Sequence, residues 1–495
     1  MTDFEARMLI DGKLVEGESG AFANINPANE DVLGEVSDAS KADMNRAVDA
    51  ARRSFDETDW STDHQLRKRC LEQLHEAIEG ELESLREELI AEVGAPRAVT
   101  HGPQLDAPFA DGLKYPARLI DTFPWETDLG DTVVSVTGVN TTRKVWREPV
   151  GVVGAIVPWN FPFEVAVNKL GQALATGNTV VLKPAPDTPF NATRLGRLIA
   201  ENTDIPAGVV NVVTASDHLV GEELTLSPKV DMISFTGSTA VGRRIMEKGA
   251  ATMKRLFLEL GGKSATIVLE DLDDTAFNSA CLIGIGPLLH AGQGCAAPTR
   301  MLLPRSRYDE GVAILKAIYE NITPGDPQDP GTLCGPVISA KQQARILGYI
   351  AKGVDEGATM LVGSTQAPTA LGLYAKGFWV SPTLFTDVDN SMTIAQEEIF
   401  GPVLVVIPYE DEDDAVRIAN DSPYGLAGNV MSGSLERSLA VARRLRAGFI
   451  GLNGTAGYGA DTPFGGYKNS GVGRQNGIAG FEQYTEIKSV AYPAG

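Results

Sequence analysis

The chain has 495 residues, of which 43% are hydrophobic and 22% are charged, and its formal net charge is −22 at pH 7. This length exceeds what one hydrophobic core usually supports, so two or three domains are expected. The strongly acidic balance argues against nucleic acid or an anionic membrane as a partner, because phosphate binding needs clustered Lys and Arg.

The N-terminal residues and the cysteines indicate the compartment. Residues 1–7 show no basic segment followed by an apolar one, so no secretory signal is expected. No apolar run is long enough to cross a bilayer. Four widely spaced cysteines without a paired framework suit a reducing compartment, so a cytoplasmic protein is expected.

The first hundred residues predict small strands followed by helices. Residues 8–36 alternate short apolar runs with turn residues, which indicates strands and loops. Ser40 and the acidic residue three positions later form a capping-box pattern, which predicts a helix start. Thr62 with Gln65 predicts the cap of a second helix, and a third helix with a leucine stripe is expected to stop at Gly94.

Two β-rich segments lie outside the helical pattern. Residues 131–147 contain two such runs around a turn at 138–140, which predicts a hairpin, and residues 484–492 predict one more strand. Exposed strands of this kind are natural edges for pairing with another subunit. We therefore expect an oligomerisation arm at 128–148 and 482–495, and a homodimer or homotetramer.

Between Val150 and Leu269 uninterrupted apolar runs alternate with helical segments. The runs are 150–157, 179–182, 209–213 and 232–236. This alternation predicts an α/β domain whose parallel sheet is covered by helices on both faces, the doubly wound arrangement. Ligands of such sheets bind beyond the carboxyl ends of the strands, so the residues after each run are candidate site residues.

Cys295 differs from the other three cysteines in its surroundings. Small residues, Gly294 and Ala296, flank it, and a ligand could therefore approach its sulfur closely. Cys70, Cys281 and Cys334 are expected to be buried core residues. Taken alone, Cys295 would also be read most readily as a small buried hydrophobe, and its role depends on the neighbouring motifs.

Six further motifs accompany the glycine-rich loop of Cys295. In chain order they are Pro158–Pro162, Lys183–Pro186, Phe235–Gly242, Glu259–Ser264, Glu397–Pro402 and Asp461–Gly471. The pair Gly237 and Gly242 is not the Gly-x-Gly-x-x-Gly fingerprint and is weak by itself. The complete ordered series, from about residue 26 to the C-terminus, resembles the NAD(P)-dependent aldehyde dehydrogenase superfamily.

The resemblance implies a fold and a division of the chain. It implies an α/β protein with two doubly wound parallel-sheet domains and a small β oligomerisation arm. Residues 1–127 and 149–260 would form a split dinucleotide-binding domain, and residues 261–465 would form the catalytic domain.

The resemblance also assigns the catalytic residues, and each assignment makes chemical sense. A thiol has an ordinary pKa of ~8.5 and must become a thiolate to attack a carbonyl, so Cys295 as nucleophile needs a base, which the family supplies with the residue at Glu259. The oxyanion that forms needs aimed donors, the amide of Asn160 and the backbone N–H of Cys295. Members that transfer the acyl group to coenzyme A generally lack the glutamate, so Glu259 favours hydrolysis to the acid.

NAD is the expected cofactor, and no metal site is expected. Around the cofactor the resemblance places Ile156, Trp159, Lys183, Gly237, Ser238, Gly242, Glu398 and Phe400. Lys183 would bind the adenosine ribose, Ser238 and nearby amides the pyrophosphate, and Glu398 with Phe400 the nicotinamide half. Pro186 stands where many NAD-preferring members carry a glutamate that repels a second phosphate, so NADP is not excluded.

The substrate side is assigned only by resemblance. The residues are Phe161, Leu289, Gly294, Ala296, Tyr458 and Phe464. Asn168 stands where some members have tryptophan, and Gln475 where several have an acidic residue that helps to move protons. A roomy, mostly apolar and aromatic entrance, and hence a medium to large apolar, terpenoid or aromatic aldehyde, is expected. The alternatives are an amino-type, betaine-type or semialdehyde substrate, a catalytically silent binding protein of this fold, and a thiol acyltransferase or hydrolase without a redox cofactor.

Overall fold

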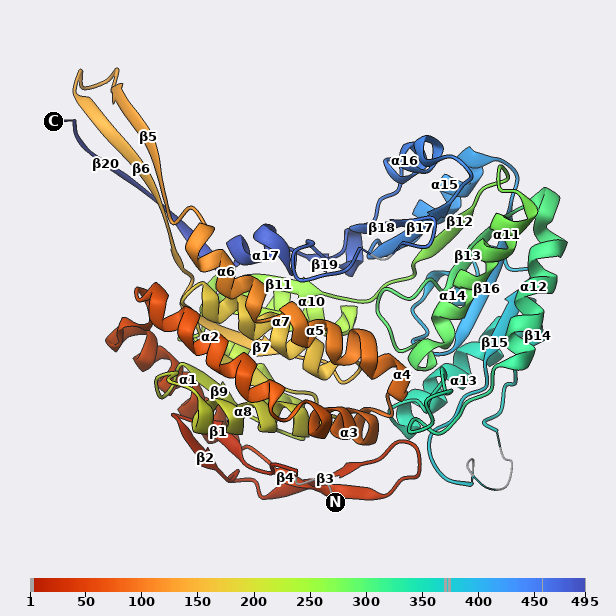
Figure 1. Cartoon of the computed structure of the whole chain (residues 1–495), viewed down its shortest axis with the longest axis horizontal. Coiled ribbons are helices and arrows are strands. Elements are labelled where there is room, and N and C mark those ends of the chain that lie inside the picture. Colours follow the sequence, from red (N-terminus) through yellow and green to blue (C-terminus); the bar gives the residue numbers. More distant parts are fainter. Residues whose placement is uncertain (1–3, 369–371, 373–374, 456, 495) are drawn as a thin grey trace.

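Two large β-sheets, each covered by helices, a projecting three-stranded arm and a small two-stranded sheet of β3 (Ala21–Ile25) and β4 (Val32–Ser37) are found among the described residues (Figure 1). The computed structural model describes residues 4–494 except 369–371, 373–374 and 456. Among the described residues, no helix is both long enough and apolar enough to span a membrane. Short elements connect the sheets and the arm. They are α4 (Arg97–Val99), α5 (Asp106–Asp111), α14 (Thr393–Gln396) and α17 (Gly477–Gln483).

Helices α1 (Lys41–Glu57) and α3 (Leu82–Val93) begin and end where local chemistry dictates. The Ser40 side chain accepts from the Asp43 N–H, and the Asp43 carboxylate accepts from the Ser40 N–H at 2.7 Å. This capping box confirms the predicted start of α1. Helix α3 ends at Gly94 with φ 69°, a left-handed conformation that glycine adopts without strain, as predicted.

The predicted cap of α2 (His64–Glu79) is wrong by one residue. Asp63, not Thr62, is the N-cap, because its carboxylate accepts from the Leu66 N–H at 2.9 Å. The Thr62 hydroxyl instead donates to the backbone carbonyl of Asp59. Both residue types favour this position, and the three-residue spacing alone could not distinguish them.

The first sheet contains eight strands in the order β19-β11-β10-β7-β8-β9-β1-β2. The strands are β1 (Met8–Ile10), β2 (Lys13–Val15), β7 (Val152–Ile156), β8 (Thr179–Lys183), β9 (Val210–Val212), β10 (Met232–Thr236), β11 (Arg255–Glu259) and β19 (Gly471–Val472). The five central strands, β11 to β9, pair in parallel. They include all four apolar runs that predicted strands.

Helices cover both faces of this sheet because alternate strand residues point to opposite sides. Val180 packs in one core with helices that include α2 and α3, and Val181 packs in the other with α1. The further helices on the first face are α6 (Lys114–Thr122), α7 (Pro162–Ala175) and α8 (Phe190–Asn202), and on the second α9 (His218–Leu226) and α10 (Thr239–Gly249). The predicted doubly wound arrangement is confirmed.

The second sheet has seven strands in the order β14-β15-β16-β13-β12-β17-β18, and only β14 is antiparallel. The strands are β12 (Ala265–Val268), β13 (Arg300–Pro304), β14 (Thr359–Val362), β15 (Thr383–Thr386), β16 (Val403–Tyr409), β17 (Ala427–Met431) and β18 (Phe449–Leu452). Its helices are α11 (Asp274–Cys281), α12 (Tyr308–Asn321), α13 (Ala340–Asp355), α15 (Glu412–Asn420) and α16 (Leu435–Ala442). Two hydrophobic cores again flank the sheet, so it too is doubly wound.

The arm joins β5 (Glu126–Val133), β6 (Asn140–Pro149) and β20 (Thr485–Pro493) in one antiparallel sheet. The predicted hairpin and C-terminal strand therefore pair with each other within one chain. In Figure 1 this sheet points away from both helix-covered sheets. Its apolar side chains are open to the surroundings, and Ile487 is 68% exposed.

Candidate active site

Cys295 follows a strained bend. The preceding 3-10 helix η4 (Leu282–Gly292) ends with His290 and Ala291 at φ 50° and 52°, in the left-handed region that residues with a side chain rarely adopt. Gly292 has φ 71°, and a Cβ there would lie 2.0 Å from the carbonyl oxygen of Gly401. The bend leaves Cys295 half-buried, whereas the other cysteines are buried as predicted.

Gln293 fixes the loop that carries Cys295. Its buried side chain accepts from the Ile338 N–H at 2.9 Å and donates to the Pro336 carbonyl at 3.3 Å. Its backbone carbonyl accepts from the side-chain amide of Asn160 at 2.7 Å. The structure therefore brings two predicted catalytic residues, Asn160 and Cys295, to one loop.

The backbone of Asn160 is held as firmly as its side chain. Its carbonyl accepts from Gln104 Nε2 at 2.6 Å and lies 3.1 Å from His290 Nε2. Burial lowers the pKa of His290 to about 4, so its imidazole is neutral near pH 7 and its Nε2–H donates to this carbonyl. The Gln293 carbonyl accepts one amide hydrogen of Asn160, and no described residue accepts the second, which could therefore donate to the predicted oxyanion. Sequence reasoning missed Gln104 and His290, for which a single sequence carries no signal.

Glu259 ends strand β11 and is 3% exposed. Burial raises the pKa of its carboxyl to about 8, and the nearby Cys295 thiol partly offsets this rise. Oxygen Oε1 of Glu259 has no hydrogen-bond partner among the described residues, although it is fully buried. A buried carboxyl close to Cys295 that keeps one unpaired oxygen is suited to accept a proton from a water.

The thiol of Cys295 has a pKa well above its ordinary value. Burial is the main cause, and the nearby carboxyls of Glu259 and Glu164 add to it. A negative charge beside a thiol disfavours the thiolate. Cys295 is therefore a thiol near neutral pH, and it would have to pass its proton to a base before it could act as a nucleophile.

The two glycines of the Glu259–Ser264 motif let the backbone pass between Cys295 and Glu398. A Cβ on Gly261 would lie 2.4 Å from Glu398 Oε2, and one on Gly262 would lie 2.6 Å from the Cys295 carbonyl oxygen. The Gly262 N–H donates to Glu398 Oε1 at 3.0 Å. This loop thus packs between Cys295 and the predicted nicotinamide-binding glutamate.

Five of the predicted cofactor residues lie at the strand ends of the first sheet or across from them: Ile156, Trp159, Lys183, Glu398 and Phe400. Lys183 and Ile156 are register partners on β8 and β7. The ring of Trp159 meets that of Phe400 edge-on at 5.4 Å, and Phe400 precedes the loop that packs on Gly292. Burial lowers the pKa of Lys183 to about 8, and the partners of its amine among the described residues are the backbone carbonyls of Pro184 and Ala215. An amine held in this way suits a neutral ribose hydroxyl.

The N-terminus of α10 supplies the remaining predicted cofactor residues. Ser238 is the N-cap of α10, and its side chain accepts from a backbone N–H of the helix. Gly237 precedes Ser238, and Gly242 is buried near the start of the helix. The Thr236 hydroxyl, two residues earlier at the end of β10, is buried and has no partner among the described residues. An exposed helix N-terminus beside a buried unpaired hydroxyl and a buried amine fits a dinucleotide with its pyrophosphate at the helix.

The predicted substrate residues form two groups. Tyr458 and Phe464 meet edge-on with ring centroids 5.0 Å apart. Phe161 meets the His290 ring at 5.5 Å, and Leu289 beside it is 43% exposed. Gly294 and Ala296 flank Cys295 and are half-buried.

Sequence reasoning missed the carboxyl of Glu164 at this side of the site. Helix α7 is buried along its whole length, and Glu164 and Lys169 are the charged residues in it. A charged residue in an otherwise apolar helix is the signal that could have found both. The Glu164 carboxylate accepts from Tyr458 and from Asn168, so the expected mostly apolar lining contains a polar group.

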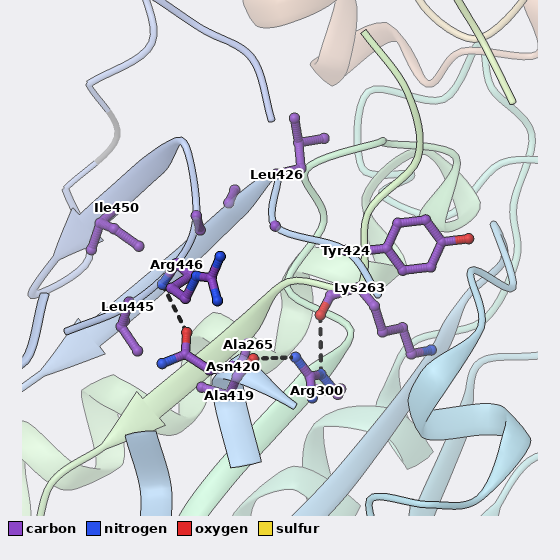
Figure 2. Close-up of a pocket in the computed structure, with 14 residues that line it drawn as sticks. Lys263, Ala265, Arg300, Ala419, Asn420, Tyr424, Leu426, Leu445, Arg446 and Ile450 are labelled. Atoms are coloured by element: carbon purple, nitrogen blue, oxygen red, sulfur yellow. Dashed lines mark hydrogen bonds between the residues drawn. The ribbon is translucent and has the colours of Figure 1, made fainter. Parts of the chain in front are cut away.

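A small pocket, shown in Figure 2, lies between the starts of β12, β13 and β17. Arg300 donates to the carbonyls of Lys263 and Ala419 there, at 3.0 and 2.9 Å. The cavity of about 20 Å³ has room for about one water molecule, so it is too small for a substrate. Among the described residues no cluster of His, Cys, Asp or Glu has the arrangement of a metal site.

Known proteins of similar sequence and structure match almost the whole chain. The profile of the aldehyde dehydrogenase family matches residues 14–490. The 3-succinoylsemialdehyde-pyridine dehydrogenase of a Pseudomonas species is 42% identical over 485 residues, which cover 97% of each chain.

Two solved structures extend the comparison. The Mycobacterium tuberculosis aldehyde dehydrogenase complexed with NAD+ has a TM-score of 0.92 and 42% identity, covering 99% of this chain and 98% of that one. A mutant aldehyde dehydrogenase C of Pseudomonas syringae complexed with NAD+ and octanal has a TM-score of 0.90 and 37% identity, covering 98% and 96%. Together with the motif series, these matches establish that the chain belongs to the aldehyde dehydrogenase family.

Proposed function

We propose that the protein oxidises an aldehyde to the carboxylic acid with NAD, through a thioester on Cys295. The observation that carries this proposal is the position of Cys295 on a loop whose Gln293 carbonyl binds the Asn160 amide, with the Glu259 carboxyl close enough to affect the pKa of the Cys295 thiol. Nucleophile, base and oxyanion donor are thus held at one place, which is the requirement for covalent acyl chemistry.

Attack begins with proton transfer from the Cys295 thiol to the carboxylate form of Glu259, directly or through water. The sulfur then forms a bond to the carbonyl carbon, and the carbonyl oxygen becomes an oxyanion. The second amide hydrogen of Asn160 and the Cys295 backbone N–H donate to this oxyanion, a type of contribution worth about 3–4 kcal/mol per donor. Lys169, whose amine lies close enough to affect the pKa of Glu259, favours the carboxylate form of the base.

Hydrolysis uses the same base a second time. Glu259 first releases the thiol proton to solvent and becomes a carboxylate again. It then accepts a proton from a water through its unpaired oxygen, and the resulting hydroxide attacks the thioester carbon. The carbon–sulfur bond breaks, the acid leaves, and the sulfur regains a proton from Glu259. The presence of this glutamate supports hydrolysis over transfer of the acyl group to coenzyme A.

NAD supplies the acceptor for the hydride that the aldehyde carbon loses. The residues that would hold it are Lys183 for the ribose, the N-terminus of α10 at Ser238 for the pyrophosphate, and Glu398 with Phe400 for the nicotinamide half. The proposed dinucleotide-binding domain is 1–127 with 149–260, and the proposed catalytic domain is 261–465.

The proposed substrate is a medium to large apolar, terpenoid or aromatic aldehyde. The aromatic rings of Phe161, Tyr458 and Phe464 beside the Cys295 loop support this choice. The related aldehyde dehydrogenase C of Pseudomonas syringae was solved in complex with octanal, an apolar aldehyde, which also supports this choice.

The proposed enzyme works in the cytoplasm as a homodimer or homotetramer assembled through the β5–β6–β20 arm. The exposed apolar side chains of the arm and its position away from the body support this assembly. Light scattering coupled to size-exclusion chromatography measures the assembly directly.

The central test is NADH formation by the purified, reduced protein with short aliphatic, long aliphatic, terpenoid, aromatic, amino and carboxylated aldehydes. We expect activity on the larger apolar members, and we expect Cys295→Ala to abolish turnover while NAD binding measured by calorimetry stays within about twofold of wild type. No activity on any aldehyde from folded protein, or full activity of Cys295→Ala, would refute the proposal.

A further inference from the structure

Glu164 is a buried carboxylate that the proposed reaction does not use. It lies in the first turn of α7 and is 7% exposed. A first-turn glutamate commonly stays in solvent and stabilises the positive end of the helix dipole. That role does not require burial, so the inward position of this side chain needs another explanation.

The hydrogen bonds of Glu164 use only one of its two oxygens. Oε1 accepts from Asn168 Nδ2 at 2.5 Å and from the Tyr458 hydroxyl. Gln475 Nε2 donates to the same hydroxyl at 3.3 Å and holds it in place. Oε2 accepts no hydrogen bond from the described residues, and it is not among their fully buried unpaired atoms. One oxygen is therefore fixed, and the other remains open to a ligand.

Glu164 lies within electrostatic range of the nucleophile. Its charge contributes to the raised pKa of the Cys295 thiol, and Cys295 in turn contributes to the raised pKa of the Tyr458 hydroxyl. Lys169 is the cation that acts on Glu164, but its amine donates to the Ser234 hydroxyl at 3.1 Å. No described cation therefore forms an ion pair with the free oxygen.

We propose that Glu164 is a specificity-determining residue whose free oxygen Oε2 accepts a hydrogen bond from an O–H or N–H group on the body of the aldehyde. The inference rests on the proposed function, because it places this group beside an aldehyde bound at Cys295. The favoured substrate is thus an aromatic or apolar aldehyde that carries one hydrogen-bond donor. Asn168 and Tyr458 position the carboxylate by holding Oε1.

Other chemistries fit the observations less well. A substrate carboxylate would meet two acidic side chains, Glu164 and Glu259, and no described cation is paired with Oε2 to attract it. A quaternary ammonium group would be attracted by charge, but it has no N–H to donate and would leave Oε2 without a hydrogen bond. Oε2 of Glu164 needs a hydrogen-bond donor on the substrate. Aldehydes that carry a hydroxyl donor and aldehydes that carry an amine donor can be compared directly.

The test compares kcat/KM, from NADH formation, for aldehydes of matched size. The panel contains meta- and para-hydroxybenzaldehyde, the methyl and methoxy analogues of each, a primary-amine aldehyde and a trimethylammonium aldehyde. The variants are Glu164→Leu, which removes the acceptor, and Glu164→Gln. The control is Glu436→Gln, because Glu436 is also a first-turn glutamate but is exposed on α16.

We expect the wild type to prefer a hydroxyl member over its methyl analogue by about 10- to 100-fold, the range for a hydrogen bond to a charged acceptor. Glu164→Leu removes this preference. Glu164→Gln reverses it in favour of the methoxy member, because the donors to Oε1 hold the amide oxygen and leave the amide N–H₂ facing the substrate. Glu436→Gln behaves as wild type. A merely structural role for Glu164 would lower all rates together and would not reverse a preference.

Three outcomes overturn the inference. They are equal kcat/KM of the wild type for hydroxyl and methyl members, an unchanged hydroxyl preference in Glu164→Leu, and a trimethylammonium aldehyde preferred over every donor-bearing member. NAD binding and alkylation of the Cys295 thiol show whether each variant is folded. Absence of NADH formation with every aldehyde would instead refute the proposed function itself, and with it this inference.

Discussion

Replacing Gly262 by alanine tests whether the backbone between Cys295 and Glu398 sets the geometry of the reaction. The new Cβ would lie 2.6 Å from the Cys295 carbonyl oxygen and 3.1 Å from the Leu426 Cβ. Ordinary contact begins at 3.4 Å, so the Cys295 backbone must move by about 0.8 Å. Misplacement of reacting groups by about 1 Å costs on the order of 100-fold in rate, which is about 2.7 kcal/mol in activation free energy.

We therefore expect Gly262→Ala to lower kcat by roughly 30- to 100-fold, with a loss of folding stability of about 1–3 kcal/mol from overpacking. The assays are steady-state NADH formation, alkylation of the Cys295 thiol and thermal unfolding. The matched control is Gly348→Ala in helix α13, where an added Cβ meets nothing within 4 Å. This control should keep wild-type kcat and gain about 0.5–1 kcal/mol of stability. A Gly262→Ala enzyme within twofold of wild-type kcat would refute the reasoning.

The remaining predictions concern the base, the cofactor and the arm. Glu259→Gln should slow hydrolysis by roughly 10²- to 10⁴-fold and accumulate a thioester visible by mass spectrometry, and an unchanged rate without an adduct would contradict its role. Because the carboxylate form of Glu259 predominates only above its pKa of about 8, kcat/KM should rise with pH through about 8, and a flat wild-type profile would argue against this base. Asp187 and Asp38 lie close enough to Lys183 to raise its pKa, and they would repel a second phosphate, so NAD should be preferred over NADP by about tenfold or more despite Pro186. Equal kcat/KM with both cofactors would contradict this. Ile487→Lys should weaken assembly of the subunits. An unchanged mass by light scattering would exclude the face of the arm that carries Ile487 as the interface between subunits.

The sequence by itself determined the family and the main elements of the fold. Apolar runs between helical segments predicted the parallel sheet, because a strand buried on both faces must be apolar throughout. The ordered motifs predicted the family, which the matching relatives confirm. The sequence also predicted the capping box at Ser40 and the end of helix α3 at Gly94, since these features depend only on residues a few positions apart.

Only the tertiary structure decided which residues surround the nucleophile. Gln104 donates to the backbone carbonyl of Asn160, and the Asn160 amide donates to the backbone carbonyl of Gln293. Glu164 accepts from Tyr458, which lies nearly three hundred residues away in sequence. Contacts of this kind join segments far apart in sequence, and no periodicity or spacing marks them. The tertiary structure also explains why residue 262 is glycine, since the carbonyl oxygen of Cys295 leaves no room for a side chain there.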